Sequence, residues 1–498
     1  MTMNNNGKQF SQFSRLAFFR NWISLTGLLI AVSAFFAFLL LFVLDSFAPF
    51  SNPYMGLLTY FVAPAVLLFG LLLGLLGAWL ERRAFAHAAP GRMPPLRIDL
   101  SQPGQRRVMG IFAVGAVLLL LVTAVGSYRS YHFTESVGFC GRMCHTVMQP
   151  EYIAYLHSPH AKVECSACHV GPGAEAFVRA KLQGTHQLLG VLRGNYPKPV
   201  PAPVKNMRSA HDTCMECHWE KRYVGILDRN YTHFLADKDN TLYTVRLLIN
   251  VGGCDPDHGP VGGIHYHMNV ARKIEFIATD ERRQVIPWVR VTEADGAVTE
   301  YRSPDFKDDP SKFAIRRMDC LDCHNRVGHQ LHTPDAAVDL AMSLGKINPA
   351  LPSIKKNAVA VLAKTYASEK EAAEKIAAGL AEQYPNEPRI HAVIGVVQDI
   401  YRQNIFPDMK ASWQAYPDNV GHKDSAGCFR CHDNQHASAT DKTKKIQAGD
   451  CKACHIIFAQ GKGADLNKGS ASGLPFAHPG GDLDPSMKCS DCHNGGSL

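Results

Sequence analysis

One motif recurs along this 498-residue chain: two nearby cysteines, with a histidine directly after the second. In Cys165, Cys168 and His169 the spacing is C-x-x-C-H, the attachment pattern of c-type haem. Two thiols at this spacing can bond to the two vinyl groups on one edge of a porphyrin. The next residue can then swing under the ring and give the iron an imidazole nitrogen. The pattern therefore predicts covalently attached haem.

Seven motifs of this kind use fourteen of the fifteen cysteines. A disulfide framework would give no reason for a histidine after every second cysteine, and structural zinc needs four ligands from paired motifs. We therefore predict seven covalent c haems, numbered in chain order, with each motif histidine as an iron ligand. The motifs are Cys140, Cys144 and His145 (one residue longer between the cysteines); Cys165, Cys168 and His169; Cys214, Cys217 and His218; Cys320, Cys323 and His324; Cys428, Cys431 and His432; Cys451, Cys454 and His455; and Cys489, Cys492 and His493.

Electron-transfer haems usually have a second protein ligand, whereas an open position suggests small-molecule chemistry. Sixteen of the 23 histidines lie outside the motifs and could supply it. For haem 1, Met148 is a rival ligand because a thioether raises the haem potential. The unpaired Cys254 is interpreted as an inert thiol. The predicted second ligands, chosen by their place near the motifs, are His160, His265, His267, His329, His422, His436 and His478.

Three apolar runs precede the first motif, at roughly Trp22–Val43, Met55–Leu80 and Val108–Val125. Each is long enough to cross the ~30 Å hydrocarbon layer of a membrane as a helix. A cleaved signal peptide is disfavoured for the first run, because no small-residue cleavage site ends it and two more runs follow. We therefore predict a three-helix membrane anchor over residues 22–126.

Charged loops predict how this anchor is oriented. The segment 81–107 carries six arginines, and the tail 1–21 is also basic. Positive loops stay in the cytoplasm, so everything after the third run is expected on the outer side, where haem is attached to such motifs. We predict the bacterial inner membrane, with the haem domain in the periplasm. The net charge of +8 includes these arginines and says little about a docking face; no nucleic-acid partner is expected.

The predicted fold class is a multihaem cytochrome c, mainly α, with irregular loops around haem and a small β insert. We expect a tetrahaem domain over 127–333, with the β insert near 270–302, where alternating residues and an Asp-Gly turn favour two or three strands. Residues 334–410 are expected to be a helical spacer, begun by a cap at Asp335 and with a second helix starting near Ser368. Residues 411–498 form a trihaem domain that is too short and polar for a core of side chains.

Longer motifs carry a family resemblance. C-G-R-M-C-H-T-V-M-Q-P-E-Y, S-P-H-A-K-V-E-C-S-A-C-H, F-V-R-A-K-L-Q-G and D-T-C-M-E-C-H-W resemble the NapC/NirT family of membrane-bound multihaem quinol dehydrogenases over about residues 130–330. The tail, with G-C-F-R-C-H-D-N-Q-H, C-K-A-C-H, F-A-H-P and C-S-D-C-H, resembles the three-haem extension of the seven-haem inner-membrane cytochromes of metal-reducing bacteria, the ImcH type.

The resemblance implies oxidation of menaquinol next to haem 1, with electrons passed along the haems to periplasmic c-type cytochromes or reductases. The family's methionine ligand maps onto Met148, although here it falls one residue later than in C-H-x-M. A family lysine aligns with Lys181. Its carboxylate partner is placed at Glu151, with Gln187 as the alternative.

The residues also favour a quinol site without the family. Quinol is soluble in lipid, and motif 1 begins only about 15 residues after the third apolar run. Its oxidation releases two protons, so Glu151, His132 or Lys181 has a role as acid or base. A second hypothesis is an electron-transfer subunit of a larger respiratory complex with no quinol site of its own. A terminal small-molecule reductase is a third, and it is disfavoured because no C-x-x-C-K motif is present.

Overall fold

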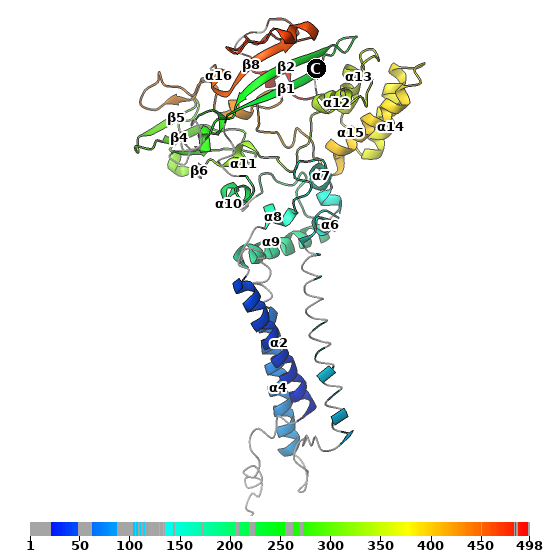
Figure 1. Cartoon of the computed structure of the whole chain (residues 1–498), viewed down its shortest axis with the longest axis vertical. Coiled ribbons are helices and arrows are strands. Elements are labelled where there is room, and N and C mark those ends of the chain that lie inside the picture. The colour runs from blue at the N-terminus through cyan, green and yellow to red at the C-terminus, as the bar shows by residue number, and fades with distance from the viewer. Residues whose placement is uncertain are drawn as a thin grey trace, which may run out of the picture. The chain divides into compact units, whose positions relative to one another are not determined.

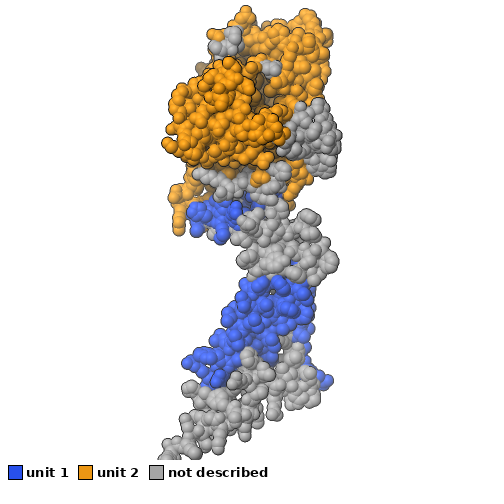
Figure 2. Space-filling view, turned by 90° about the vertical axis from the view of Figure 1, so that its left-hand side faces the viewer, with its two compact units in different colours: residues 1–140, 165–189 blue, residues 141–164, 190–498 orange. Residues whose placement is uncertain are grey.

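The computed structural model describes residues 21–47, 62–86, scattered positions from 103 to 135, and most of 136–496. Its gaps after residue 136 are 143–144, 171–173, 205–208, 219–224, 254–261, 269–271, 450, 483 and 485–486. The chain forms two units, residues 1–140 with 165–189 and residues 141–164 with 190–498 (Figure 2).

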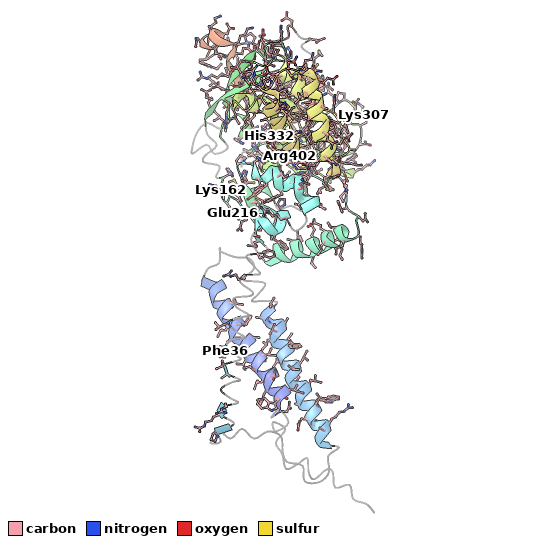
Figure 3. All side chains as sticks on the ribbon, turned by 90° about the vertical axis from the view of Figure 1, so that its right-hand side faces the viewer. Phe36, Lys162, Glu216, Lys307, His332 and Arg402 are labelled. Carbon is pink, nitrogen blue, oxygen red and sulfur yellow. The ribbon has the colours of Figure 1, made fainter. Side chains whose placement is uncertain are left out.

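The first unit contains two apolar helices, α2 (Trp22–Phe47) and α4 (Ala63–Ala86), which pack against each other (Figure 1). Small residues allow this: a Cβ on Gly27 would lie 2.3 Å from the backbone nitrogen of Gly74, and the Ser24 hydroxyl donates to the Gly74 carbonyl at 2.9 Å. Both helices are long and apolar enough to cross a membrane. Side chains such as Phe36, which is 59% exposed, remain uncovered (Figure 3). The third predicted span falls mostly outside the described residues.

The second unit contains two antiparallel sheets. One has the order β1 (Ile226–Phe234), β2 (Leu242–Asn250), β8 (His455–Gly461). The other has the order β6 (Arg316–Arg317), β3 (Lys273–Ile277), β4 (Trp288–Thr292), β5 (Val298–Arg302), β7 (Ala437–Ser438). The strands predicted within 273–301 are β3 to β5, and the β1–β2 hairpin was not predicted.

Strands from the tail complete both sheets. The β8 strand pairs with β2, and β7 pairs with β5, so segments about 140 to 210 residues apart in the sequence share hydrogen bonds. Residues of the predicted tetrahaem and trihaem segments therefore interleave within one unit. The residues that the structure describes have mixed helix and sheet content, and the predicted mainly α class is not confirmed.

Four helices form the largest apolar core: α12 (Pro334–Ser343), α13 (Ile354–Leu362), α14 (Glu369–Gln383) and α15 (Ile390–Asn404). The Ser368 hydroxyl accepts from the Glu371 backbone at 3.2 Å, which explains why α14 begins there. Thr333, not Asp335, caps α12 and accepts from the Ala336 backbone at 3.2 Å. Thr333 precedes a proline, the favoured first residue of a helix, and this leaves Asp335 free for another contact.

Asp335 belongs to a buried ionic cluster. The ammonium of Lys355, which is fully buried, lies 2.7 Å from Asp335 Oδ1 and 2.7 Å from Asp339 Oδ1. Lys423 Nζ lies 2.6 Å from Asp335 Oδ2, and His233 Nδ1 lies 3.0 Å from Asp339 Oδ2. His233, Asp335 and Asp339 have the donor types of a metal site, but the Lys355 ammonium already supplies the positive charge between the two carboxylates.

Candidate haem-binding sites

Most of the described cysteine motifs fold as single helical turns. These turns are α8 (Cys165–His169), α11 (Cys320–Cys323), the 3-10 turn η7 (Gly427–Arg430), α16 (Cys451–Cys454) and α17 (Cys489–Cys492). Motif 3 is a hydrogen-bonded turn that begins at the last residue of α10 (Ala210–Cys214), and the described part of motif 1 belongs to α6 (Val137–Arg142) and α7 (His145–Leu156).

One backbone hydrogen bond recurs in these turns. The N–H of His218, His324 and His493 donates to the carbonyl of the first cysteine of its own motif, at 2.7, 2.8 and 2.8 Å. Residues three and four apart lie on one face of a helical turn, so both thiols and the imidazole are presented on the same side. The C-x-x-C-H spacing is thus the spacing that one turn needs to hold a porphyrin edge and its iron.

Five motif histidines each face a second histidine from elsewhere in the chain. An imidazole nitrogen binds a transition metal at about 2.0 Å, so the centres of two imidazoles on opposite sides of one metal ion lie about 6 Å apart. The ring centres observed here fit that separation, so each pair of histidines could hold one haem iron. The pairs are His218 with His160 at 6.0 Å, His324 with His265 at 6.4 Å, His432 with His267 at 5.8 Å, His455 with His422 at 6.2 Å, and His493 with His478 at 5.9 Å.

Hydrogen bonds orient several of these rings. The Nδ1 atoms of His267, His432 and His160 lie 2.8, 2.9 and 3.3 Å from backbone carbonyls, which leaves Nε2 for a metal. Within the part of the chain that the structure describes, Nδ1 of His422 and of His455 is buried without a hydrogen-bond partner. Burial lowers the pKa of both imidazoles, which favours the neutral form that binds metal.

His436, predicted as a ligand, does not fit that role. Its Nδ1 lies 2.9 Å from the Asp433 carboxylate, and its Nε2 lies 2.7 Å from the Ile286 carbonyl. Both ring nitrogens are thus engaged, and the side chain is 98% buried between the tail and the β insert, with 2% exposed. The prediction for His436 is wrong because closeness to a motif in the sequence does not determine where the ring points. Here the ring points into the protein interior, where it is hydrogen-bonded to Asp433 and Ile286.

His329 and Glu151 form a different arrangement. His329 Nδ1 donates to the Glu151 carbonyl at 3.0 Å and lies 3.3 Å from Glu151 Oε2. The largely buried Arg326 lies 3.4 Å from the same carboxylate oxygen and 4.3 Å above the Tyr416 ring. Glu151 is therefore no solvated surface charge. Its contacts orient the imidazole of His329.

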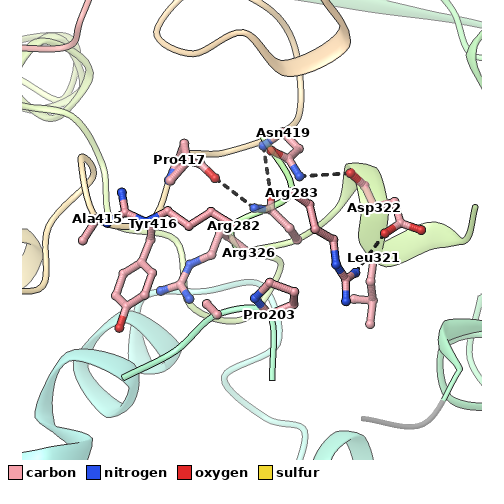
Figure 4. A pocket seen from close by; sticks show the side chains of 12 residues that line it. Pro203, Arg282, Arg283, Leu321, Asp322, Arg326, Ala415, Tyr416, Pro417 and Asn419 are labelled. Atoms are coloured by element: carbon pink, nitrogen blue, oxygen red, sulfur yellow. Dashed lines mark hydrogen bonds and ion pairs between the residues drawn. The ribbon is translucent and has the colours of Figure 1, made fainter. Parts of the chain in front are cut away.

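A small cavity borders Arg326 and Tyr416 (Figure 4). Its volume is about 30 Å³, enough for about one water molecule. Asn419, which also lines it, donates to the Asp322 carbonyl at 3.0 Å. Burial is the main reason that the pKa of Tyr416 rises to about 12. This cavity is far too small to bind a quinol.

The surroundings of motif 1 are described only in part. Met148 lies half-buried on α7, and Lys181 is on α9 (Ala174–Leu192). His132, Cys144 and Cys254, and the side chains of His145 and Lys181, fall outside the described residues. In the first unit, a hydrogen bond with Cys140 raises the pKa of the Cys165 thiol. The first thiols of motifs 1 and 2 are therefore in contact.

Some interactions were missed by sequence reasoning. His332, which is labelled in Figure 3, and His157 were not among the predicted second ligands; burial is the main cause that lowers the pKa of His332, Asp418 opposes this shift, and the neighbouring His157 adds to it. The partners of the second ligands were missed as well, because no local pattern joins His160 to motif 3 or His267 to motif 5. For these pairs the sequence contained no signal beyond the histidines themselves.

Comparison with known proteins gives one strong match. No family model and no solved structure matches the chain. Over 488 residues the chain is 39% identical to the cytochrome c-type protein ImcH of Geobacter sulfurreducens, and the match covers 95% of each chain. The predicted resemblance to that type is confirmed, whereas the wider NapC/NirT resemblance stays a prediction. The chain belongs to the ImcH family of c-type cytochromes, whose haem is bound covalently.

Proposed function

We propose that this chain is a membrane-anchored heptahaem c-type cytochrome of the bacterial inner membrane. It oxidises menaquinol near haem 1 and passes the electrons along its haems to c-type cytochromes or reductases in the periplasm. In this proposal the motif thiols attach seven haems, the motif histidines bind the irons, and α2 and α4 hold the chain in the membrane.

The observation that carries the electron-transfer role is the pairing of motif histidines with second histidines at 5.8 to 6.4 Å. An iron held on both faces by the protein has no position for a small substrate. The five pairs therefore favour electron transfer over reduction of a small molecule at motifs 3 to 7. Met148 is the proposed second ligand of haem 1, and His329 is proposed as a second ligand of another haem.

The quinol site is proposed from chemistry and from the family resemblance. Lys181, Glu151 and His132 are its candidate acids and bases, since two protons must leave with the electrons. Lys181 and Glu151 belong to different units. Because Glu151 is paired with Arg326 and orients His329, its proposed role is to position the imidazole, and Lys181 is the stronger candidate for proton transfer.

The test is reduction of the purified protein in lipid by a menaquinol analogue, followed at the haem α band. Lys181→Ala should slow reduction by quinol and leave reduction by dithionite unchanged, while Lys181→Arg should keep part of the rate. Lys370→Ala, at an exposed position on α14, is the matched control. If quinol fails to reduce the unmodified protein and dithionite succeeds, the chain is an electron-transfer subunit loaded by a partner, and the proposed quinol site is wrong.

A further inference from the structure

We propose that the haems of motifs 3 to 7 form one row in the order of their motifs, and that the short 3-10 helix η4 (Ile264–Met268) joins site 4 to site 5. The inference rests on the proposed function for the presence of these haems. It goes beyond that function by assigning which site neighbours which, and which residues hold each pair of neighbours together.

The junction of sites 4 and 5 depends on two histidines that are separated by Tyr266 alone. His265 faces His324 of motif 4 at 6.4 Å, and His267 faces His432 of motif 5 at 5.8 Å. One turn of helix thus supplies the second ligand to two different sites. Because a single rigid turn holds both rings, these two sites cannot lie far apart.

Glycines fix the position of that turn. Gly263 has a φ of +67°, and a Cβ there would lie 2.4 Å from the Asn250 carbonyl at the end of β2. Gly252 has a φ of +70°, and its Cβ would lie 1.6 Å from the Gly262 carbonyl. The backbone approaches too closely for any side chain at either position. The η4 turn is therefore held tightly against the end of the three-stranded sheet.

A second contact joins motifs 4 and 5 directly. The guanidinium of Arg430, inside motif 5, donates to the carbonyl of Asp322, inside motif 4, at 2.7 Å and to the carbonyl of Arg283 at 2.8 Å. Asn419 donates to the same Asp322 carbonyl at 3.0 Å. The two motif turns are thus hydrogen-bonded to each other independently of η4.

Sites 5 and 6 are joined by an aromatic stack. His422, which faces His455 of motif 6, stacks on Phe429 of motif 5 with ring centres 4.3 Å apart and planes 10° from parallel. The Cys428 N–H also donates to the Gly421 carbonyl at 2.9 Å. The second ligand of site 6 is therefore built onto the turn that carries site 5.

Sites 6 and 7 are joined through Asp335. Lys423, the residue after His422, pairs with Asp335 Oδ2 at 2.6 Å. The Asp335 N–H donates to the carbonyl of Gly495 at 3.0 Å, two residues after His493 of motif 7. One aspartate thus connects the segment of the site 6 ligand to the segment of the site 7 ligand.

Sites 3 and 4 are joined at the start of their motif turns. The Ala210 N–H, at the beginning of α10, donates to Asp319, the capping residue of α11. Site 5 therefore has two neighbours in the row, sites 4 and 6, and site 7 has one, site 6.

The number of neighbours can be measured by electron paramagnetic resonance without any quinol. Removing a second ligand makes one ferric haem high-spin, and this centre speeds the spin relaxation of low-spin haems next to it. In the full-length oxidised protein, His267→Ala should speed the relaxation of two low-spin signals and His478→Ala that of one. His391→Ala, at an exposed position on α15, is the control and should change none.

Two results would overturn the row: a single affected signal in the His267 variant, or more than one in the His478 variant. If the His267 variant fails to fold or loses its haem, His265→Ala repeats the test at site 4, which should affect the signals of sites 3 and 5. Because the readout involves no quinol, a failed row leaves the proposed quinol oxidation standing. Equally, a protein that does not oxidise quinol can still contain the row.

Discussion

The ammonium of Lys355 lies 2.7 Å from Asp339 Oδ1 in a place where Lys355 has no exposed surface. This pair joins α13 to α12 in the core of the helical layer. Through Asp335 the same cluster reaches Lys423, next to the proposed second ligand of site 6. The helical layer is thus connected to the haem-binding segments by charge as well as by apolar packing.

Replacing Lys355 by methionine should destabilise the chain strongly. The change leaves two buried carboxylates without the ammonium between them, and breaking a buried pair typically costs about 3–5 kcal/mol. Thermal or urea unfolding followed by far-ultraviolet circular dichroism measures the loss. Lys356→Met, at the exposed neighbouring position, is the matched control. Equal stability of the two variants would show that the cluster contributes nothing to folding.

Asp335 should make the stability depend on acid pH. Burial raises the pKa of its carboxyl, but Lys423 and Lys355 outweigh burial and lower it from 3.8 to about 2. A pKa that is lower in the folded state stabilises the protein above pH 3.8, and this contribution is lost as the pH falls toward 2. Its size is about 2 kcal/mol.

The measurement for Asp335 is urea unfolding between pH 5 and 2, for which Asp335→Asn is the test variant and Asp399→Asn, at an exposed position on α15, the control. The Asp335 variant should lose less stability over this interval than the unmodified chain, because its amide does not titrate. If the free energy of unfolding of Asp335→Asn depends on pH in the same way as that of the unmodified chain, the pairing of Asp335 with Lys423 and Lys355 is contradicted.

His436→Leu should leave every haem spectrum unchanged. Both nitrogens of this ring are hydrogen-bonded within the protein, to Asp433 and Ile286. The variant should lose about 1–3 kcal/mol of stability, since the Ile286 carbonyl stays buried without a donor. Absorbance and electron paramagnetic resonance spectra report the haem ligands. The appearance of a high-spin haem would instead make His436 an iron ligand.

Glu151→Gln should raise the midpoint potential of one haem. A carboxylate next to one nitrogen of a ligand imidazole makes the other ring nitrogen a stronger donor, which stabilises the oxidised iron. The Glu151 carboxylate lies 3.3 Å from Nδ1 of His329, a proposed ligand, and this Nδ1 donates to the Glu151 backbone carbonyl. Potentiometric titration measures the shift, with Glu382→Gln, at an exposed position on α14, as control. Unchanged potentials combined with slower quinol oxidation would instead favour a direct role of Glu151 in proton transfer.

The sequence predictions that agree with the structure were based on the spacing of residues within one short segment. The C-x-x-C-H motifs form single turns because their residues lie three and four apart, and that geometry is local. The β3 to β5 strands follow from alternating residues around the Asp-Gly turn, and α14 follows from its cap at Ser368. In each case one short segment contains all the information that determines the structure.

Tertiary structure alone decided which histidines meet. His160 and His218 are 58 positions apart, and the spacing within either segment contains nothing about the other. His436 follows its motif as closely as His329 does, yet its ring is held by Asp433 and Ile286 because β7 pairs with β5. Such contacts form only when distant strands come together. The amino-acid sequence by itself therefore determined where haem can attach, and the packing of the sheets decided how the sites are paired.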